Sequence, residues 1–310
     1  MDVGYIFNVS SNNPIIMELK KQKNIQSSPG HSEYKSFYKS VGGNEGEKCN
    51  YPTRLDLYGK GCYHDCSYCY AKSLLNFRKL WDVEHPAVAD INKVLKVIRK
   101  IPSGSIVRLG DMTDCFQPIE SRCHVTYEAI KELNKQGIGY LIVTKSSMVA
   151  DDKYIRLMDK KLAHIQISIT TMDDDLSRTY ERACVPSQRI NALEKLQQHN
   201  FDVSLRLSPF IPQYIDFKKL NTIKCDKILV EFLRVNTWIK QWFNIDYSEY
   251  TFKQSGYQHL PLELKIKYLE QISGFKQLTV CEDVTEHYEY WKNKINPNPC
   301  LLYTSPSPRD

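Results

Sequence analysis

Three cysteines with the spacing C-x3-C-x2-C lie close together in the sequence, at Cys62, Cys66 and Cys69. Three thiolates on one short loop can bind three irons of a [4Fe–4S] cubane and leave the fourth iron without a protein ligand. That open iron can chelate the amino and carboxylate groups of S-adenosylmethionine (SAM). Electron transfer from the cluster then splits a carbon–sulfur bond and yields a 5′-deoxyadenosyl radical. Tyr68, directly before the third cysteine, is placed to pack against the adenine.

A zinc site made of the three cysteines and His64 is the alternative. Zinc loops usually carry C-x2-C pairs separated by about a dozen residues or more, whereas this loop has three ligands and no second pair follows. We therefore expect a cluster, with His64 shaping the loop instead of binding the metal. The other seven cysteines are scattered along the chain, which is not the pattern of a disulfide scaffold.

The elements that must position this loop are predicted from short apolar runs and helical stripes that alternate along the chain. The runs of strand length are 53–58, 105–110, 139–144, 163–170, 202–207 and 227–233. Helical periodicity occupies 88–98, 127–133, 154–158 and 190–196, the last with Ser187 as a plausible N-cap. Alternating strands and helices imply right-handed βαβ units and a parallel sheet. Six such repeats predict an α/β fold that forms a barrel or a partial barrel.

The domain organisation follows from changes in composition. We expect a polar N-terminal arm over 1–50, a core barrel over 51–235 and an aromatic-rich extension over 236–300. The extension either caps the barrel or forms an aromatic wall that stacks a substrate base. Residues 301–310 look like translated sequencing-adaptor sequence, so we expect a non-native tail there.

Polar residues at the carboxyl ends of the predicted strands are the further site candidates. Asp114 and Cys115 follow the second strand, where polar residues favour an active site over a turn with Asp114 as a helix cap. Lys145 ends the third strand and either pairs with the SAM carboxylate or is a solvated charge. Arg206 and Ser208 end the fifth strand. A buried Arg206 needs an anionic partner, and a SAM carboxylate or a substrate phosphate would serve.

The cysteine motif resembles the signature of the radical SAM superfamily, whose core is a partial (β/α)6 barrel of the TIM type with the cluster loop after its first strand. Five blocks look like the spore photoproduct lyase-like branch of that superfamily, in the same order over residues 50–235. They are GCYHDCSYCYA, GDMTDCFQPIE, VTKS, ISITT and LSPFIP.

This resemblance implies roles for individual residues. Thr113, Lys145 and Ser168 fall where that branch contacts SAM. Spore photoproduct lyase has a hydrogen-donating cysteine where Asp111 stands here, so thymine-dimer repair itself is not implied. Cys115, four residues later, is a candidate hydrogen donor, and Asp114 is a candidate catalytic residue.

Composition sets the class of partner. The chain has 42% hydrophobic and 25% charged residues, no secretory signal and no apolar run near the ~20 residues of a membrane span, so we expect a cytoplasmic protein. The net charge of +6 permits an anionic partner without requiring one. The favoured hypothesis is a lyase-like radical SAM enzyme acting on DNA or another nucleic acid, with flavodoxin or ferredoxin as electron donor. Modification of a peptide or RNA is the alternative, and a non-catalytic zinc-binding module is a third.

Overall fold

Most of the chain folds around one mixed sheet of eight strands, in the order β1-β2-β5-β6-β7-β8-β9-β12. The computed structural model describes residues 37–40, 48–49, 51 and 53–296. Within the sheet, β1 is antiparallel to β2 and every other neighbouring pair is parallel. The strands are Tyr38–Ser40 (β1), Thr53–Leu55 (β2), Ile106–Leu109 (β5), Gly139–Thr144 (β6), Ala163–Ile169 (β7), Asp202–Phe210 (β8), Lys227–Phe232 (β9) and Gln277–Cys281 (β12).

The six predicted strands are therefore confirmed as β2 and β5 to β9, and they follow one another in the sheet in chain order. Among the described strands, β1 and β12 are the two edges, so the sheet is a partial barrel and not a closed one. Two short ladders lie outside it. They are Tyr58–Gly59 (β3) with Ala87–Val88 (β4), and Phe252–Gln254 (β10) with Tyr257–His259 (β11).

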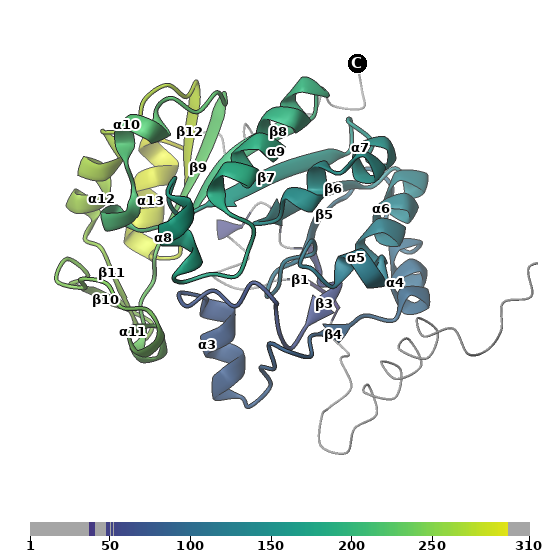
Figure 1. The fold of residues 1–310 in the computed structure, drawn as a ribbon, viewed down its shortest axis with the longest axis horizontal. Helices are drawn as coiled ribbons and strands as arrows, with labels where there is room; N and C mark the ends of the chain where they lie inside the picture. The colour runs from purple at the N-terminus through teal and green to yellow at the C-terminus, as the bar shows by residue number, and fades with distance from the viewer. Residues whose placement is uncertain (1–36, 41–47, 50, 52, 297–310) are drawn as a thin grey trace, which may run out of the picture. The chain divides into compact units, whose positions relative to one another are not determined.

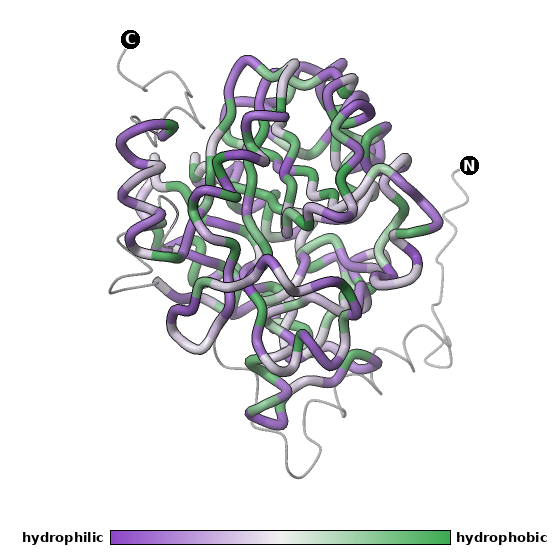
Figure 2. The backbone as a smooth tube through the Cα atoms, turned by 90° about the vertical axis from the view of Figure 1, so that its left-hand side faces the viewer, coloured by the Kyte–Doolittle hydropathy of each residue, from purple (hydrophilic) through white to green (hydrophobic). Residues whose placement is uncertain are grey.

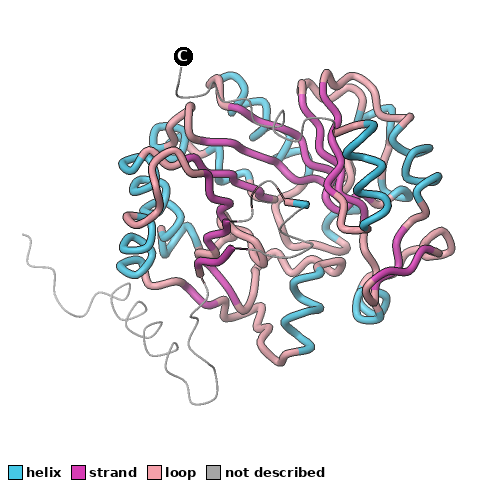
Figure 3. Tube along the Cα trace, turned by 180° about the vertical axis from the view of Figure 1, so that it is seen from behind, coloured by secondary structure: helices cyan, strands magenta, loops and turns pink. Residues whose placement is uncertain are grey.

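Helices follow the parallel strands and lie outside the sheet (Figure 1). Seen from behind, the strands form the inner layer and the helices the outer one (Figure 3). The α-helices are Tyr70–Phe77 (α3), Ile91–Ile98 (α4), Glu120–Cys123 (α5), Val125–Gln136 (α6), Asp152–Leu157 (α7), Asp174–Arg178 (α8), Pro186–Gln198 (α9), Phe217–Leu220 (α10), Thr237–Trp242 (α11), Leu262–Leu269 (α12) and Thr285–Lys294 (α13). Two 3₁₀ turns cover Ser147–Ala150 and Pro212–Tyr214.

The sequence explains why the central strands are buried on both faces. All seven residues of β7 are buried, including its polar ones, because β6 and β8 flank the strand and α9 packs on it. Parallel strands covered in this way read as nearly continuous apolar runs. The hydrophobic stretches in Figure 2 are accordingly concentrated toward the inner part of the trace.

Local signals set some of the helix ends, but one prediction is wrong. The Asp90 side chain caps α4 by accepting hydrogen bonds from two backbone N–H groups, and Gly137 ends α6 with a φ of 63°. Ser187, which we predict as the N-cap of α9, lies inside that helix. The helix begins at Pro186, whose fixed φ suits the first turn, and Val185 takes the cap position. Ser187 instead donates from its hydroxyl and its backbone N–H to Asp174.

The C-terminal extension contributes to the sheet and also covers it. Its strand β12 pairs with β9. Phe243, after α11, packs edge-on against Tyr68, Tyr180 and Tyr214, as a cap would. None of the helices in the described ranges has the length and hydropathy that crossing a bilayer requires. The predicted tail and most of the predicted N-terminal arm lie outside the described residues, so the domain boundaries stay predictions.

Candidate active site

A cavity of about 560 Å³ lies at the carboxyl ends of the parallel strands. It contains nearly all the predicted site residues, although they come from five different segments of the chain. Those that line it are Cys62, Cys66, Tyr68, Cys69, Thr113, Asp114, Lys145, Ser168, Arg206 and Ser208. This position agrees with the rule that active sites of parallel barrels lie at the strand ends that the following loops extend.

The three cysteines lie on the loop between β3 and α3. Cys62 and Cys66 are buried, and Cys69 is the N-cap of α3, with its sulfur 3.4 Å from the backbone nitrogen of Lys72. The residue before the first cysteine is packed against another loop. A Cβ at Gly61 would lie 1.8 Å from the carbonyl oxygen of Asp82, so only glycine fits there.

The donor set fits a cluster better than a single ion. Among the described residues, His259, Glu282 and Asp283 are the one group of three metal-ligand atoms that lie within 4.8 Å of one another. Neither the three loop cysteines nor His64 with two of them meet that limit. Zinc–sulfur bonds of about 2.3 Å would hold thiolates less than about 4 Å apart. A cubane, whose irons occupy different corners, holds its thiolates further apart, which is compatible with loop thiols that do not all lie within 4.8 Å of one another.

Burial keeps the loop thiols protonated when no metal is bound. It raises the pKa of Cys62 to about 12, with a contribution from Asp114, and it raises the pKa of Cys69 as well. For Cys66, burial and the nearby Glu181 carboxylate raise the pKa well above the usual range. Binding to iron must therefore displace these protons.

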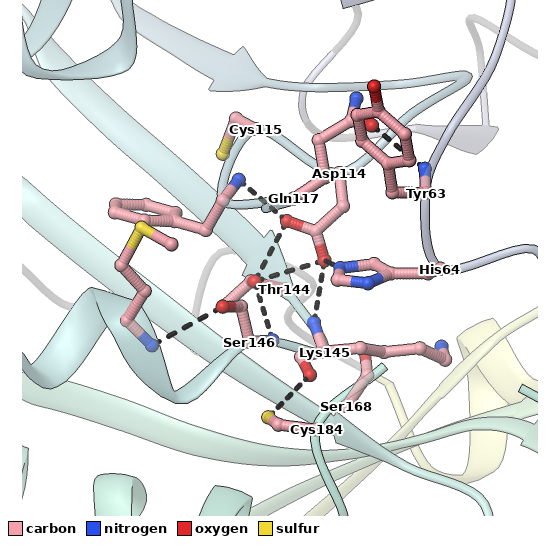
Figure 4. A network of polar contacts seen from close by, with 12 residues as sticks. Tyr63, His64, Asp114, Cys115, Gln117, Thr144, Lys145, Ser146, Ser168 and Cys184 are labelled. Atoms are coloured by element: carbon pink, nitrogen blue, oxygen red, sulfur yellow. Dashed lines mark hydrogen bonds and ion pairs between the residues drawn. The ribbon is translucent and has the colours of Figure 1, made fainter. Parts of the chain in front are cut away.

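Asp114 joins the cysteine loop to the third parallel strand (Figure 4). Its carboxylate lies 3.1 Å from His64 Nε2, and it accepts hydrogen bonds from Thr144 Oγ1 at 2.8 Å and Lys145 N at 2.7 Å. It also accepts from Phe116 N at 2.8 Å. Burial alone would raise the pKa of Asp114, but these hydrogen bonds more than offset it, and the pKa is lowered. Asp114 thus fixes the geometry of the loop.

Lys145 presents its ammonium group to the cavity. Its Nζ donates to the carbonyl oxygen of Ser208 at 2.8 Å and lies 5.6 Å from the centre of the Tyr68 ring. In the described part of the chain, no carboxylate forms an ion pair with it. A cation in this position can receive an anionic group of a ligand.

The comparison with protein families decides the class of protein. The family model for the radical SAM superfamily matches residues 57–218, just over half of the chain, and this range includes the cysteine loop. The chain belongs to the radical SAM superfamily. The protein is therefore an enzyme, as we expect from the cysteine motif. Membership of the superfamily implies SAM and an iron–sulfur cluster as cofactors.

Known proteins resemble this radical SAM chain in sequence and in structure. An uncharacterized protein, ORF301 of Acidianus two-tailed virus, is 24% identical over 164 residues, which are 49% of this chain and 54% of that protein. The chain thus spans about half the length of the curated relative it matches. Spore photoproduct lyase complexed with dinucleoside spore photoproduct has a TM-score of 0.56 at 14% identity, covering 93% of this chain and 94% of that one. A mutant of that lyase with bound AdoMet and the same dinucleoside has a TM-score of 0.57, at the same identity and coverage. At this identity the likeness shows the fold.

Several predicted site residues of this radical SAM protein form hydrogen bonds or ion pairs with other residues of the same chain. Arg206 lies between Gln166 Oε1 at 2.6 Å and Glu231 Oε2 at 2.5 Å, so its anionic partner is a carboxylate from the next strand. Ser208 donates to the same Glu231 oxygen at 2.7 Å. Thr113 donates from its hydroxyl to the carbonyl oxygen of Tyr58 at 2.7 Å. Ser168 is buried in β7 and lines the cavity.

Cys115 is the predicted residue that lies apart from the others. Its side chain is fully buried, and it is not among the residues that line the cavity. Figure 4 shows its sulfur outside the network around Asp114. Asp111, at the expected position of a donor cysteine, forms ion pairs with Arg54 and Lys39. The geometry thus gives Cys115 no access to a substrate in the cavity.

The main feature that sequence reasoning missed is a buried ion pair behind the cysteine loop. Glu181 pairs with Arg189, accepts a hydrogen bond from the Tyr68 hydroxyl and lies 3.9 Å from the sulfur of Cys66. Arg189 also donates to the carbonyl oxygens of Cys184 at 2.6 Å and Ser168 at 3.0 Å. No motif marks Glu181, because it follows a short helix 115 residues after Cys66.

Proposed function

We propose that this radical SAM enzyme holds a [4Fe–4S] cluster on Cys62, Cys66 and Cys69, and that it cleaves SAM to methionine and a 5′-deoxyadenosyl radical. The observation that carries the proposal is that the three loop thiols and the ammonium group of Lys145, which lies 5.6 Å from the ring of Tyr68, share one cavity. When bound, the cluster would supply one electron and an iron with an open coordination position.

The residues of the chain have separate tasks in this proposal. The pair of Glu181 and Arg189 orients Tyr68 beside the loop, and Asp114 holds His64 and the backbone at Lys145 in place. The Lys145 ammonium group binds the SAM carboxylate, because it has no carboxylate partner in the described residues and lies 5.6 Å from the ring of Tyr68 on the cysteine loop. A reductant of the flavodoxin or ferredoxin class delivers the electron.

We propose a nucleic acid, DNA in the first place, as the substrate. Three features support it: the net charge of +6, arginines inside the cavity, and the fold shared with a lyase whose structure contains a dinucleoside photoproduct. Its hydrogen-donor chemistry would differ from a cysteine-dependent one, because Asp111 is an ion-paired carboxylate.

Anaerobic reconstitution tests the cleavage reaction. We expect a brown protein with about four irons per chain that forms 5′-deoxyadenosine from SAM when it is reduced. Substitution of any one loop cysteine by alanine should reduce this product to the level of a protein-free blank. Cys123→Ala is the matched control, since Cys123 is half-buried on α5 and does not line the cavity. A colourless protein containing zinc, or cleavage retained in Cys66→Ala, would contradict the proposal.

The substrate is tested separately with single-stranded DNA, duplex DNA, RNA and peptides. A nucleic-acid substrate should raise the rate of 5′-deoxyadenosine formation above the rate seen with SAM alone. Stimulation by peptides and not by nucleic acids would overturn the proposed substrate and leave the cleavage reaction intact.

A further inference from the structure

Two arginines lie side by side on the inner face of the sheet. Arg54 of β2 and Arg108 of β5 are direct partners in the parallel ladder, and both line the cavity. Like charges placed opposite each other on neighbouring strands destabilise a sheet unless an anion lies between or beside them. The question is therefore which anion balances this pair.

The carboxylate of Asp111 forms an ion pair with Arg54 and none with Arg108. Asp111 Oδ1 accepts from Arg54 Nη1, while Asp111 Oδ2 lies 2.5 Å from Lys39 Nζ. Asp111 thus already has two cations. The Arg108 guanidinium forms no ion pair or hydrogen bond with any described residue, and its Nε is buried without a partner. Arg108 is half-buried as a whole, and its buried Nε–H costs free energy unless a ligand in the cavity accepts a hydrogen bond from it.

The surroundings of Arg108 suit a nucleotide. The rings of Tyr70 and Tyr257 line the same cavity, and the Arg234 guanidinium lies 4.3 Å from the centre of the first and 5.8 Å from the centre of the second. Flat rings of this kind stack on bases without regard to sequence. A guanidinium fork pairs with two phosphate oxygens at once, which a lysine cannot do.

We propose that Arg108, with Arg54 beside it, binds a phosphate group of the substrate inside the cavity. This inference rests on the proposed function and names the part of the nucleic acid that anchors it. The SAM carboxylate is assigned to Lys145 instead, because that lysine lies beside Tyr68 and its backbone nitrogen is held by Asp114, which also holds His64 of the cysteine loop.

The test changes the charge on both partners. A dinucleoside monophosphate and its uncharged methylphosphonate analogue are titrated into the reconstituted protein under anaerobic conditions. We expect Arg108→Gln to weaken binding of the phosphate form by about ten- to a hundredfold, the range for a lost charged hydrogen bond. The same substitution should change binding of the methylphosphonate by less than about twofold, since that probe has no charge to lose.

Matched variants separate charge from structure. Arg156→Gln removes an equal charge from the exposed end of α7 and should leave binding of both probes unchanged. Arg108→Lys keeps the charge without the fork and should restore part of the lost affinity. If Arg108→Gln does not fold, the wild-type protein still provides the comparison, because it should bind the phosphate form about tenfold or more tightly than the analogue.

Three outcomes would overturn the proposal. They are equal affinity of the wild type for the two probes, equal losses for both probes in Arg108→Gln, and a loss of SAM affinity that matches the loss for the phosphate probe. Binding of an acidic peptide through Arg108 in place of the dinucleotide would assign the site to a different substrate. Because these titrations need no SAM cleavage, their failure is distinct from failure to form 5′-deoxyadenosine.

Discussion

At the scale of single residues, the cavity depends on charges that are buried and paired. Glu181 and Arg189 have no exposed side-chain surface. Burial lowers the pKa of Arg189, and the Glu181 charge more than offsets this, so the pKa is raised. Removal of one member of such a pair leaves the other charge in a poorly solvating environment.

Glu181→Gln should therefore destabilise the protein by about 3–5 kcal/mol, measured by urea unfolding of the metal-free form. Replacement of both residues by apolar ones, Glu181→Leu with Arg189→Met, should recover most of that loss. An unchanged urea midpoint in Glu181→Gln would show that the pair contributes nothing to stability.

The sequence predicts residues of the site where a strand end or a motif marks them. The three cysteines, Lys145 and Ser208 come together in the cavity. This is expected because the carboxyl ends of parallel strands, and the loops that follow them, meet at one edge of the sheet. The partners that orient them could not be predicted. Glu231 lies inside an apolar strand, and Glu181 lies in a loop with no pattern. Their roles arise from contacts across many residues of chain, which local spacing does not encode.

At the scale of elements, the turn after β5 places Asp111 and Asp114. Gly110 begins it with a φ of 77°, and a Cβ there would lie 2.6 Å from the carbonyl oxygen of Thr113. The turn therefore needs glycine for its backbone conformation and for space.

Gly110→Ala should destabilise the protein by about 2 kcal/mol or more and loosen the Asp114 network, through backbone strain and the clash together. Gly104→Ala is the matched control, because Gly104 has a φ of 80° and open space around its Cα. Its cost should be the backbone strain alone, about 1 kcal/mol. Equal thermal midpoints for the two variants would contradict the clash.

The repeating elements were predictable because each needs only local signals. Apolar runs identify β2 and β5 to β9, and helical stripes identify α4, α6, α7 and α9. The edges of the sheet were not predictable in this way. Strand β1 has only three residues and pairs with β2. Strand β12 pairs with β9, although most of the C-terminal extension lies between them in the sequence. Ser187 shows the same limit within a helix, where Pro186 determined the start.

At the scale of the whole molecule, the C-terminal elements join the barrel through a buried polar group. Lys265 of α12 donates to Glu282 at 2.5 Å and lies 3.0 Å from His287 Nδ1 on α13. Burial lowers the pKa of His287 to about 4, with Lys265 and His259 adding to the effect. Burial likewise lowers the pKa of His259 to about 4.

This arrangement predicts a loss of stability in acid. Between pH 6.5 and 4 the unfolded chain binds protons at these histidines and the folded chain does not, so stability falls as the pH falls through that window. His287→Gln keeps an acceptor for Lys265 and removes one titrating group. Relative to this variant, the wild type should lose about 2 kcal/mol between pH 6.5 and 4. Parallel unfolding profiles for the two proteins would contradict the assignment.

The contact between Gly61 and Asp82 has a consequence for how the cofactor is acquired. The backbone just before Cys62 is held by a neighbouring loop at a distance that no side chain permits, and Asp82 N donates to the carbonyl oxygen of Lys60 at 2.6 Å. Cys62, the first of the three proposed cluster ligands, is thus positioned by the fold before any metal binds. The conformational entropy lost in ordering this part of the loop belongs to folding and does not reduce the affinity for iron.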